Sequence, residues 1–265
     1  MVYLEISFAL PCDRAVGRQT SDPLTLDYLP IFPDDTPQTD EVWRVNADAT
    51  ILRRGDEIHV FRAQLLRPNH GPTDVALKID HSGKRTGAFL DEATAYTKLV
   101  AAFQGTIVPR FFGCFQTTLS NTTISCIITE YCGEPLHTNL PESPPELKAQ
   151  LINVVEQIHR AGVAHGDLQE ANILLKDGKL KLIDWEKASS HSCDRQLRLL
   201  QGAIVPTPEE FGRNELYETF CEMGLWSAST TPFMGVNIDN NPSGRLKSLD
   251  ITYRPTCTSI RHGRK

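Results

Sequence analysis

The chain has 265 residues, of which 40% are hydrophobic and 23% charged, proportions typical of a globular protein that buries a sizeable core. Its formal net charge of −6 argues against nucleic-acid binding as its main function. It contains no apolar run long enough to cross a membrane, and the first residues lack the basic charge of a signal peptide. We therefore expect no nucleic-acid partner and no membrane contact.

The cysteines predict a reducing environment. Seven occur, an odd number, and none forms a CxxC pair. Unpaired and mostly buried thiols are typical of proteins inside the cell. We expect an intracellular, cytoplasmic protein. A nuclear location is the alternative, although the basic residues near the C-terminus are too few to predict a nuclear signal.

Residues 1–48 are interpreted as an N-terminal extension. Short apolar runs are mixed there with acidic residues and prolines. This pattern fits a strand-forming segment as well as it fits a linker. From residue 49 the pattern changes: apolar runs at 51–52 and 58–61 flank polar residues, which predicts a β-hairpin with its turn at Gly55 and Asp56.

The next predicted strand, residues 75–80, carries Lys78 in its centre. Lysine is depleted in strand interiors, and an ammonium group buried without a partner is costly. Lys78 therefore either faces solvent or has a functional role.

A helix is predicted over residues 87–103, with Gly105 just past its end. Its apolar stripe is formed by Phe89, Ala93, Tyr96, Val100 and Phe103. Two acidic residues, Asp91 and Glu92, lie next to the stripe, and one position on a helix rotates a side chain by about 100°. Two further strands, residues 111–115 and 123–128, follow and lead into the segment 129–133.

The densest set of polar residues follows a predicted helix that begins at Ser143 and ends at Gly162. Asp167 lies five residues before Asn172, and Asp184 ends an apolar strand twelve residues after Asn172. A tight hairpin between them would bring Asn172 and Asp184 to the same end. Phosphoryl transfer uses such a set: one acid to orient the attacking hydroxyl and accept its proton, and an amide with a second acid to hold magnesium.

Beyond Glu186 the signals are weaker. Residues 207–210 form a capping box, which predicts a helix through Trp226 with an apolar inner face. This face consists of Phe211, Leu216, Phe220 and Met223. Residues 227–265 are poor in apolar side chains and predict a disordered tail.

The segment 163–186 resembles the catalytic and metal-binding loops of the protein-kinase-like superfamily, in which H-[RG]-D-L-x-x-x-N precedes a hairpin and D-F-G. The resemblance covers about residues 49–226. It is nearest to short, single-domain kinase-like proteins of the RIO-type and aminoglycoside phosphotransferase branches. It implies an α+β, bilobal kinase-like fold with a small antiparallel β lobe (49–134) and a truncated helical lobe (135–226).

The resemblance also implies ATP and Mg²⁺ as cofactors and a role for each site residue. Lys78 would hold the α- and β-phosphates and pair with Glu92, with Asp91 as the alternative partner. Asp167 would act as the catalytic base. The remaining roles are Gly55 over the phosphates, the backbones of Glu130 and Cys132 at the adenine, and Asn172 with Asp184 on the metal.

Four departures from the kinase pattern affect these expectations. Gly55 is the single glycine of its hairpin, which limits the approach of backbone amides to phosphate, so an ordinary hairpin remains an alternative. Gly166 replaces the catalytic-loop arginine, and Gln169 stands where protein kinases place a lysine that steadies the γ-phosphate. Residues 185–186 replace the Phe-Gly of D-F-G.

Three functions are compatible with this sequence. The first is an ATP- and Mg-dependent phosphotransferase that acts on serine or threonine of proteins, including the chain itself. The second is the same chemistry on a small hydroxyl-bearing molecule. The third is a non-catalytic nucleotide-binding module, a pseudokinase or scaffold.

Overall fold

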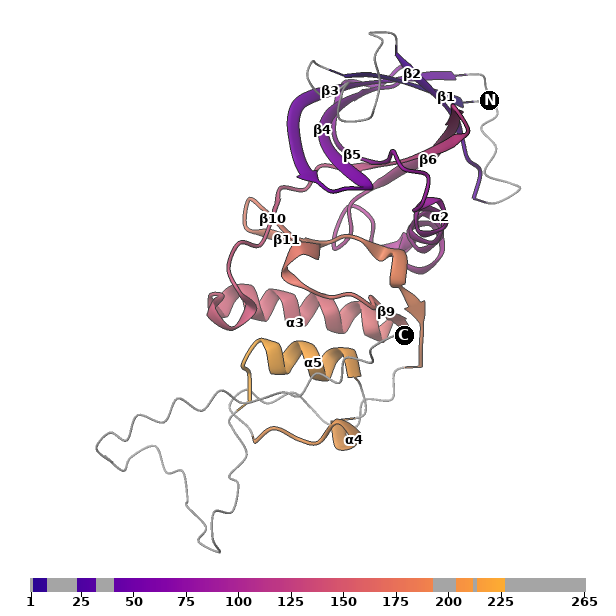
Figure 1. Ribbon diagram of the computed structural model, residues 1–265. Coiled ribbons are helices and arrows are strands. Elements are labelled where there is room, and N and C mark those ends of the chain that lie inside the picture. The colour runs from indigo at the N-terminus through magenta and orange to yellow at the C-terminus, as the bar shows by residue number, and fades with distance from the viewer. Residues whose placement is uncertain (1, 9–22, 32–40, 193–203, 212–213, 227–265) are drawn as a thin grey trace, which may run out of the picture. The chain divides into compact units, whose positions relative to one another are not determined.

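The computed structural model describes residues 2–8, 23–31, 41–192, 204–211 and 214–226, to which every structural statement below refers (Figure 1). The chain divides into two compact units. The first, here the barrel unit, comprises Met1–His137 and Gln157–His191. The second, the helical unit, comprises Thr138–Glu156 and Ser192–Lys265.

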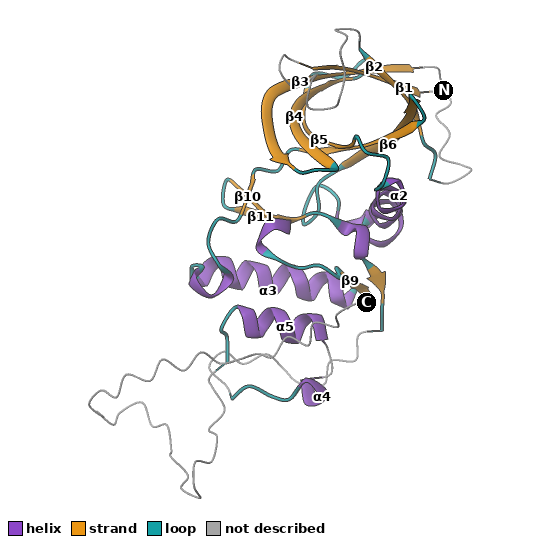
Figure 2. Cartoon of the chain, viewed as in Figure 1, coloured by secondary structure: helices purple, strands orange, loops and turns teal. Residues whose placement is uncertain are grey.

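The barrel unit contains a closed β-barrel (Figures 1 and 2). Its strands follow the order β1-β2-β6-β7-β5-β4-β3 around the barrel. They are β1 (Val2–Phe8), β2 (Leu24–Tyr28), β3 (Glu41–Arg54), β4 (Ile58–Leu66), β5 (Thr73–Asp80), β6 (Phe111–Leu119) and β7 (Thr122–Glu130). Alternate side chains of each strand point inward, as Phe61, Ala63 and Leu65 of β4 do, and fill the interior.

The barrel differs from the expected antiparallel lobe in two ways. The pair β1–β3 is parallel, and closure leaves no free sheet edge among these strands. The expected boundary at residue 49 lies inside β3, and β1 and β2 come from the segment interpreted as an extension. The physical reason is a two-residue apolar period in that segment, which buries Leu4, Ile6 and Leu26 in the barrel core.

The helix predicted over residues 87–103 is divided into three pieces: α2 (Thr86–Thr94), a π-helical turn (Ala95–Leu99) and a 3₁₀ turn (Ala101–Phe103). The N–H of Val100 bonds the carbonyl of Ala95, five residues back, at 3.0 Å. The side-chain amide of Gln104 donates from Nε2 to the backbone carbonyl of Tyr96 at 2.9 Å and so takes the place of a helical N–H donor. The apolar stripe is nevertheless buried as predicted from Phe89 to Val100.

The loops that carry the polar set also belong to the barrel unit, although they were expected in the helical lobe. They contain a sheet of β11 (Lys179–Leu182), β10 (Ile173–Lys176) and β8 (Glu134–Pro135), and the pair β9 (Val163–Ala164) with β12 (Ser189–Ser190). These loops also contain two 3₁₀ turns: η5 (Glu170–Asn172), directly before β10, and η6 (Trp185–Lys187), between β11 and β12. The N–H of Leu182 donates to the carbonyl of Ile107 at 2.9 Å, and Lys181 pairs with Glu130 at 2.8 Å, which ties this sheet to the barrel.

The helical unit contains η4 (Leu140–Glu142), the first part of α3 (Pro145–Arg160), α4 (Pro208–Phe211) and α5 (Asn214–Glu222). Its predicted inner face is confirmed, since Phe211, Leu216, Phe220 and Met223 are buried. The single helix expected through Trp226 is replaced by α4 and α5, and the predicted tail 227–265 lies outside the described residues. No helix in the described part of the chain is long and apolar enough to span a membrane.

Candidate active site

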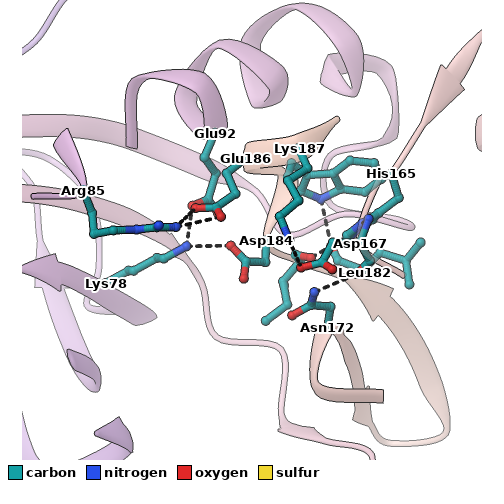
Figure 3. Close-up of polar contacts among 12 residues, drawn as sticks. Lys78, Arg85, Glu92, His165, Asp167, Asn172, Leu182, Asp184, Glu186 and Lys187 are labelled. Atoms are coloured by element: carbon teal, nitrogen blue, oxygen red, sulfur yellow. Dashed lines mark hydrogen bonds and ion pairs between the residues drawn. The ribbon is translucent and has the colours of Figure 1, made fainter. Parts of the chain in front are cut away.

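Lys78 connects two acidic residues of the site (Figure 3). It occupies β5 between the inward-facing Leu77 and Ile79, so its side chain leaves the barrel on the outer face. Its ammonium contacts Glu92 Oε2 of α2 at 2.6 Å and Asp184 Oδ1 at 2.8 Å. The pairing with Glu92 is confirmed, whereas Asp91 is exposed.

Burial and charge have opposite effects on these three groups. Burial lowers the pKa of Lys78, but the two carboxylates raise it by more, so the lysine stays charged. Burial raises the pKa of Glu92, and Lys78 only partly offsets this change. Burial also raises the pKa of Asp184, but Lys78, Arg53 and His165 together lower it by more, and the net direction is downward. Asp184 is therefore the more strongly ionised of the two acids.

Asp184 has a left-handed backbone, with φ 67° and ψ 63°, and stands directly before η6. Lys78 contacts one oxygen of its carboxylate, so the other can bind a cation. After Asp184, Trp185 is fully buried, donates from Nε1 to the Leu182 carbonyl at 3.1 Å, and packs against the ring of His165 at 4.4 Å. A buried tryptophan therefore anchors this turn where kinases have Phe-Gly.

The second half of this turn is held by an ion pair that the sequence analysis missed. Glu186 accepts two hydrogen bonds from Arg85 Nη2, each of 2.7 Å (Figure 3). Arg85 stands at the start of α2, where its N–H bonds the buried carboxylate of Asp80 at 2.8 Å. The ion pair connects the helix that carries Glu92 with the turn that follows Asp184. Sequence spacing contains no signal for it, because 101 residues separate the partners.

The catalytic-type loop is organised by His165 and Asn172. Nε2 of His165 contacts the Ile183 carbonyl at 2.9 Å, and Nδ1 contacts the Asp167 N–H at 3.3 Å. A carbonyl only accepts and a backbone N–H only donates, so these contacts fit the neutral ring protonated at Nε2. The side-chain amide of buried Asn172 donates to the Asp167 carbonyl at 2.8 Å, which leaves its oxygen as the ligand atom.

The carboxylate of Asp167 has two neighbours. Lys187 Nζ lies 2.9 Å from Asp167 Oδ2 (Figure 3). Gln169 Nε2 lies 3.4 Å from the same oxygen. Gly166 next to it has φ +80°, and a Cβ there would overlap the carbonyl oxygen of Lys187. Sequence analysis missed Lys187, since kinase motifs end before this position.

The predicted adenine and phosphate segments have contacts of their own. Gly55 closes the β3–β4 turn, with its N–H on the Ile58 carbonyl at 2.9 Å. In the segment after β7, the Glu130 carbonyl accepts the thiol of Cys132 at 3.4 Å, and the Glu130 carboxylate pairs with Lys181. Burial raises the pKa of the Cys132 thiol to about 11. The contacts of Gly55, Glu130 and Cys132 with a nucleotide stay predictions.

The donor atoms fit magnesium. Asn172 and Asp184 offer an amide and a carboxylate oxygen, and hard oxygen ligands are those that Mg²⁺ prefers. Among the described residues, no group of three or more His, Cys, Asp or Glu side chains could hold a metal ion by itself. The remaining ligands would therefore be phosphate oxygens and water, which is the usual way in which proteins bind Mg²⁺ with nucleotides.

A lysine held between a helix glutamate and an aspartate, beside a loop that orients an aspartate and an asparagine, is the arrangement of a kinase-like protein. A family model described as RIO domain matches residues 120–221. The match and the site together support a kinase-like, RIO-type protein.

Two of the following three curated relatives carry kinase names. A probable serine/threonine-protein kinase of Streptomyces coelicolor is 24% identical over 205 residues, which cover 70% of this chain and 30% of the relative. A CDPK-related protein kinase of Daucus carota is 28% identical over 197 residues, 68% of this chain and 31% of the relative. Phototropin-1A of Oryza sativa is 28% identical over 163 residues, which cover 57% of this chain and 17% of the relative. The chain spans less than a third of the length of each.

Proposed function

We propose that this protein transfers the γ-phosphate of ATP, in the presence of Mg²⁺, to serine or threonine hydroxyls of a protein. The observation that carries the proposal is the position of Lys78 between Glu92 and Asp184, at 2.6 and 2.8 Å. An ammonium held in this way is charged and oriented toward the acid that would bind the metal. The protein-kinase names of the relatives support a protein substrate over a small molecule.

Four residues of the site have parts in the proposed reaction: Lys78, Asp167, Asn172 and Asp184. Lys78 would bind the α- and β-phosphates, and Asn172 with Asp184 would hold Mg²⁺, which when bound neutralises charge on the phosphates. Asp167 accepts the proton of the acceptor hydroxyl while the hydroxyl oxygen attacks the terminal phosphorus. The bond from this phosphorus to the oxygen bridging to the β-phosphate breaks, and ADP leaves with that electron pair.

Binding of the adenine and the phosphates would be completed by backbone groups from two segments. We assign the Glu130 carbonyl and the Cys132 backbone to adenine, and the turn at Gly55 to the phosphates. Two contacts of Glu130 support this assignment: its N–H donates to the Arg110 carbonyl, and its carboxylate accepts a hydrogen bond from Lys181.

A binding and transfer assay tests the proposal. Calorimetric titration with ATP, with and without Mg²⁺, should show tighter binding with the metal, and incubation with labelled ATP should label the protein itself or a generic protein substrate. Binding without any transfer would favour the non-catalytic module. Hydrolysis stimulated only by small alcohols or sugars would favour the small-molecule kinase. Absence of ATP binding would contradict the proposal.

A further inference from the structure

The site contains a cation for which the proposed roles above have no use. Lys187 Nζ lies 2.9 Å from Asp167 Oδ2, on the acid proposed as the base (Figure 3). Its side chain is 53% exposed, so the ammonium is hydrated and can move from this carboxylate to a nearby anion. A surface ion pair of this kind contributes little to stability, which favours a role other than folding.

The backbone around Lys187 explains how the ammonium comes to be there. Lys187 ends the turn η6, and its carbonyl oxygen lies so close to Gly166 that a Cβ at residue 166 would overlap it. Gly166 adopts φ +80°, a conformation that glycine tolerates best. An arginine at residue 166 would therefore displace the Lys187 backbone. The glycine that removes one cation from the loop also lets a different one approach Asp167.

Gln169 contacts the same carboxylate as Lys187. Its amide lies 3.4 Å from Asp167 Oδ2, the same oxygen that Lys187 contacts. Gln169 occupies the sequence position at which a lysine would steady the transferred phosphoryl group, and it carries no charge. The two side chains thus converge on one carboxylate oxygen, and Lys187 is the one that supplies a positive charge.

From this geometry we infer that Lys187 is a catalytic residue that binds the γ-phosphate and stabilises the phosphoryl group during transfer, in place of a lysine at position 169. The inference rests on the proposed phosphotransfer. In the unliganded protein Lys187 holds the Asp167 carboxylate. When the terminal phosphate is present, the ammonium turns to its oxygens, and Asp167 is freed to accept the hydroxyl proton. Lys187 thereby links the availability of the base to the presence of the phosphoryl donor.

The first experiment compares Lys187→Met with Lys179→Met, which removes an exposed lysine of β11 as a matched control. Lys187→Met should slow phosphoryl transfer by about 10²–10³-fold. It should also weaken the binding of ATP by about tenfold and leave the affinity for ADP unchanged, because only ATP has the γ-phosphate that the ammonium binds. The control should change neither quantity, and the melting temperatures of both variants should match that of the parent.

A rescue variant separates this role from a structural one. Adding Gln169→Lys to Lys187→Met places an ammonium beside the same oxygen and should recover at least about tenfold of the lost rate. If Lys187→Met leaves the ratio of ATP to ADP affinity and the transfer rate unchanged, the inference is wrong and the proposed function stands. If the double variant recovers nothing, charge at this oxygen is not what Lys187 provides, which also overturns the inference. A parent protein that does not bind ATP would overturn both proposals.

Discussion

At the residue scale, Lys78 joins two elements that are distant in the sequence. One ammonium serves two carboxylates, Glu92 on α2 and Asp184 before η6. The group therefore keeps an excess of one negative charge beside a backbone turn. That excess would attract a divalent cation, and it makes the site sensitive to loss of the lysine.

Removing this lysine should make stability depend on pH in a defined direction. In Lys78→Met, nothing opposes the effect of burial on Glu92, so its pKa rises further above the ordinary value. A carboxyl whose folded-state pKa is raised stabilises the fold at low pH and loses this contribution as pH rises. The loss of melting temperature caused by Lys78→Met should thus be larger at about pH 8 than at about pH 5. Equal losses at both values, measured by circular dichroism, would contradict the charge network.

Asp167 should be required for transfer and dispensable for nucleotide binding. Asp167→Asn retains the size of the side chain and removes the proton acceptor, and losses of a general base are typically about 10²–10⁴-fold. Calorimetric ATP affinity should remain that of the parent. If turnover stays within about threefold of the parent while ATP still binds, Asp167 only shapes the loop.

At the scale of elements, the approach of the η6 backbone to the catalytic-type loop depends on Gly166. Gly166→Ala adds a Cβ that overlaps the Lys187 carbonyl, at a residue with φ +80°. Gly178→Ala is a matched control, because Gly178 has φ +73° but open space around it. The control should cost about 1 kcal/mol for the left-handed backbone alone.

Gly166→Ala should cost about 1–3 kcal/mol more than the control in the free energy of unfolding, because the two backbones must separate. Urea denaturation of both variants gives the difference directly. Equal destabilisation would show that the two segments do not need this close approach.

One central contact, between Lys78 and Glu92, was predicted from the sequence, whereas the contact of Lys78 with Asp184 and those that depend on backbone approach were not. Lys78, Glu92 and Asp184 could be singled out because the segments around them resemble kinase motifs, although solvent exposure of Lys78 and Asp91 in place of Glu92 remained alternatives. Arg85, Glu186 and Lys187 could not, since their pairing depends on the turn η6 and on the start of α2. The interruption after Thr94 was also missed, because the apolar stripe continues through the π-helical turn with the period of a helix.

At the scale of the whole molecule, the N-terminal strands are part of the core that carries Lys78. The two-residue period of β1 and β2 is visible in the sequence, but their partners β3 and β6 are not, because strand pairing over long separations has no local signal. Closure of the barrel therefore became apparent only in three dimensions.

The core role of β1 predicts a large effect of truncation there. Leu4 is fully buried, so Leu4→Ala should destabilise the protein by about 2–5 kcal/mol. Leu119→Ala removes the same atoms from a residue that is 40% exposed and should change stability by no more than about 0.5 kcal/mol. Urea denaturation that finds Leu4→Ala as mild as Leu119→Ala would mean that residues 1–48 are a separate extension after all.

The most direct test of magnesium-dependent phosphotransfer concerns the metal at Asp184. Asp184→Asn keeps the shape of the side chain and removes its charge, and Asp177→Asn is the control, an exposed aspartate that is also left-handed, with φ 51°. Calorimetric titration with ATP should show that Asp184→Asn weakens binding with Mg²⁺ more than binding without it, while the control changes neither. Equal losses with and without Mg²⁺ would show that Asp184 does not bind the metal.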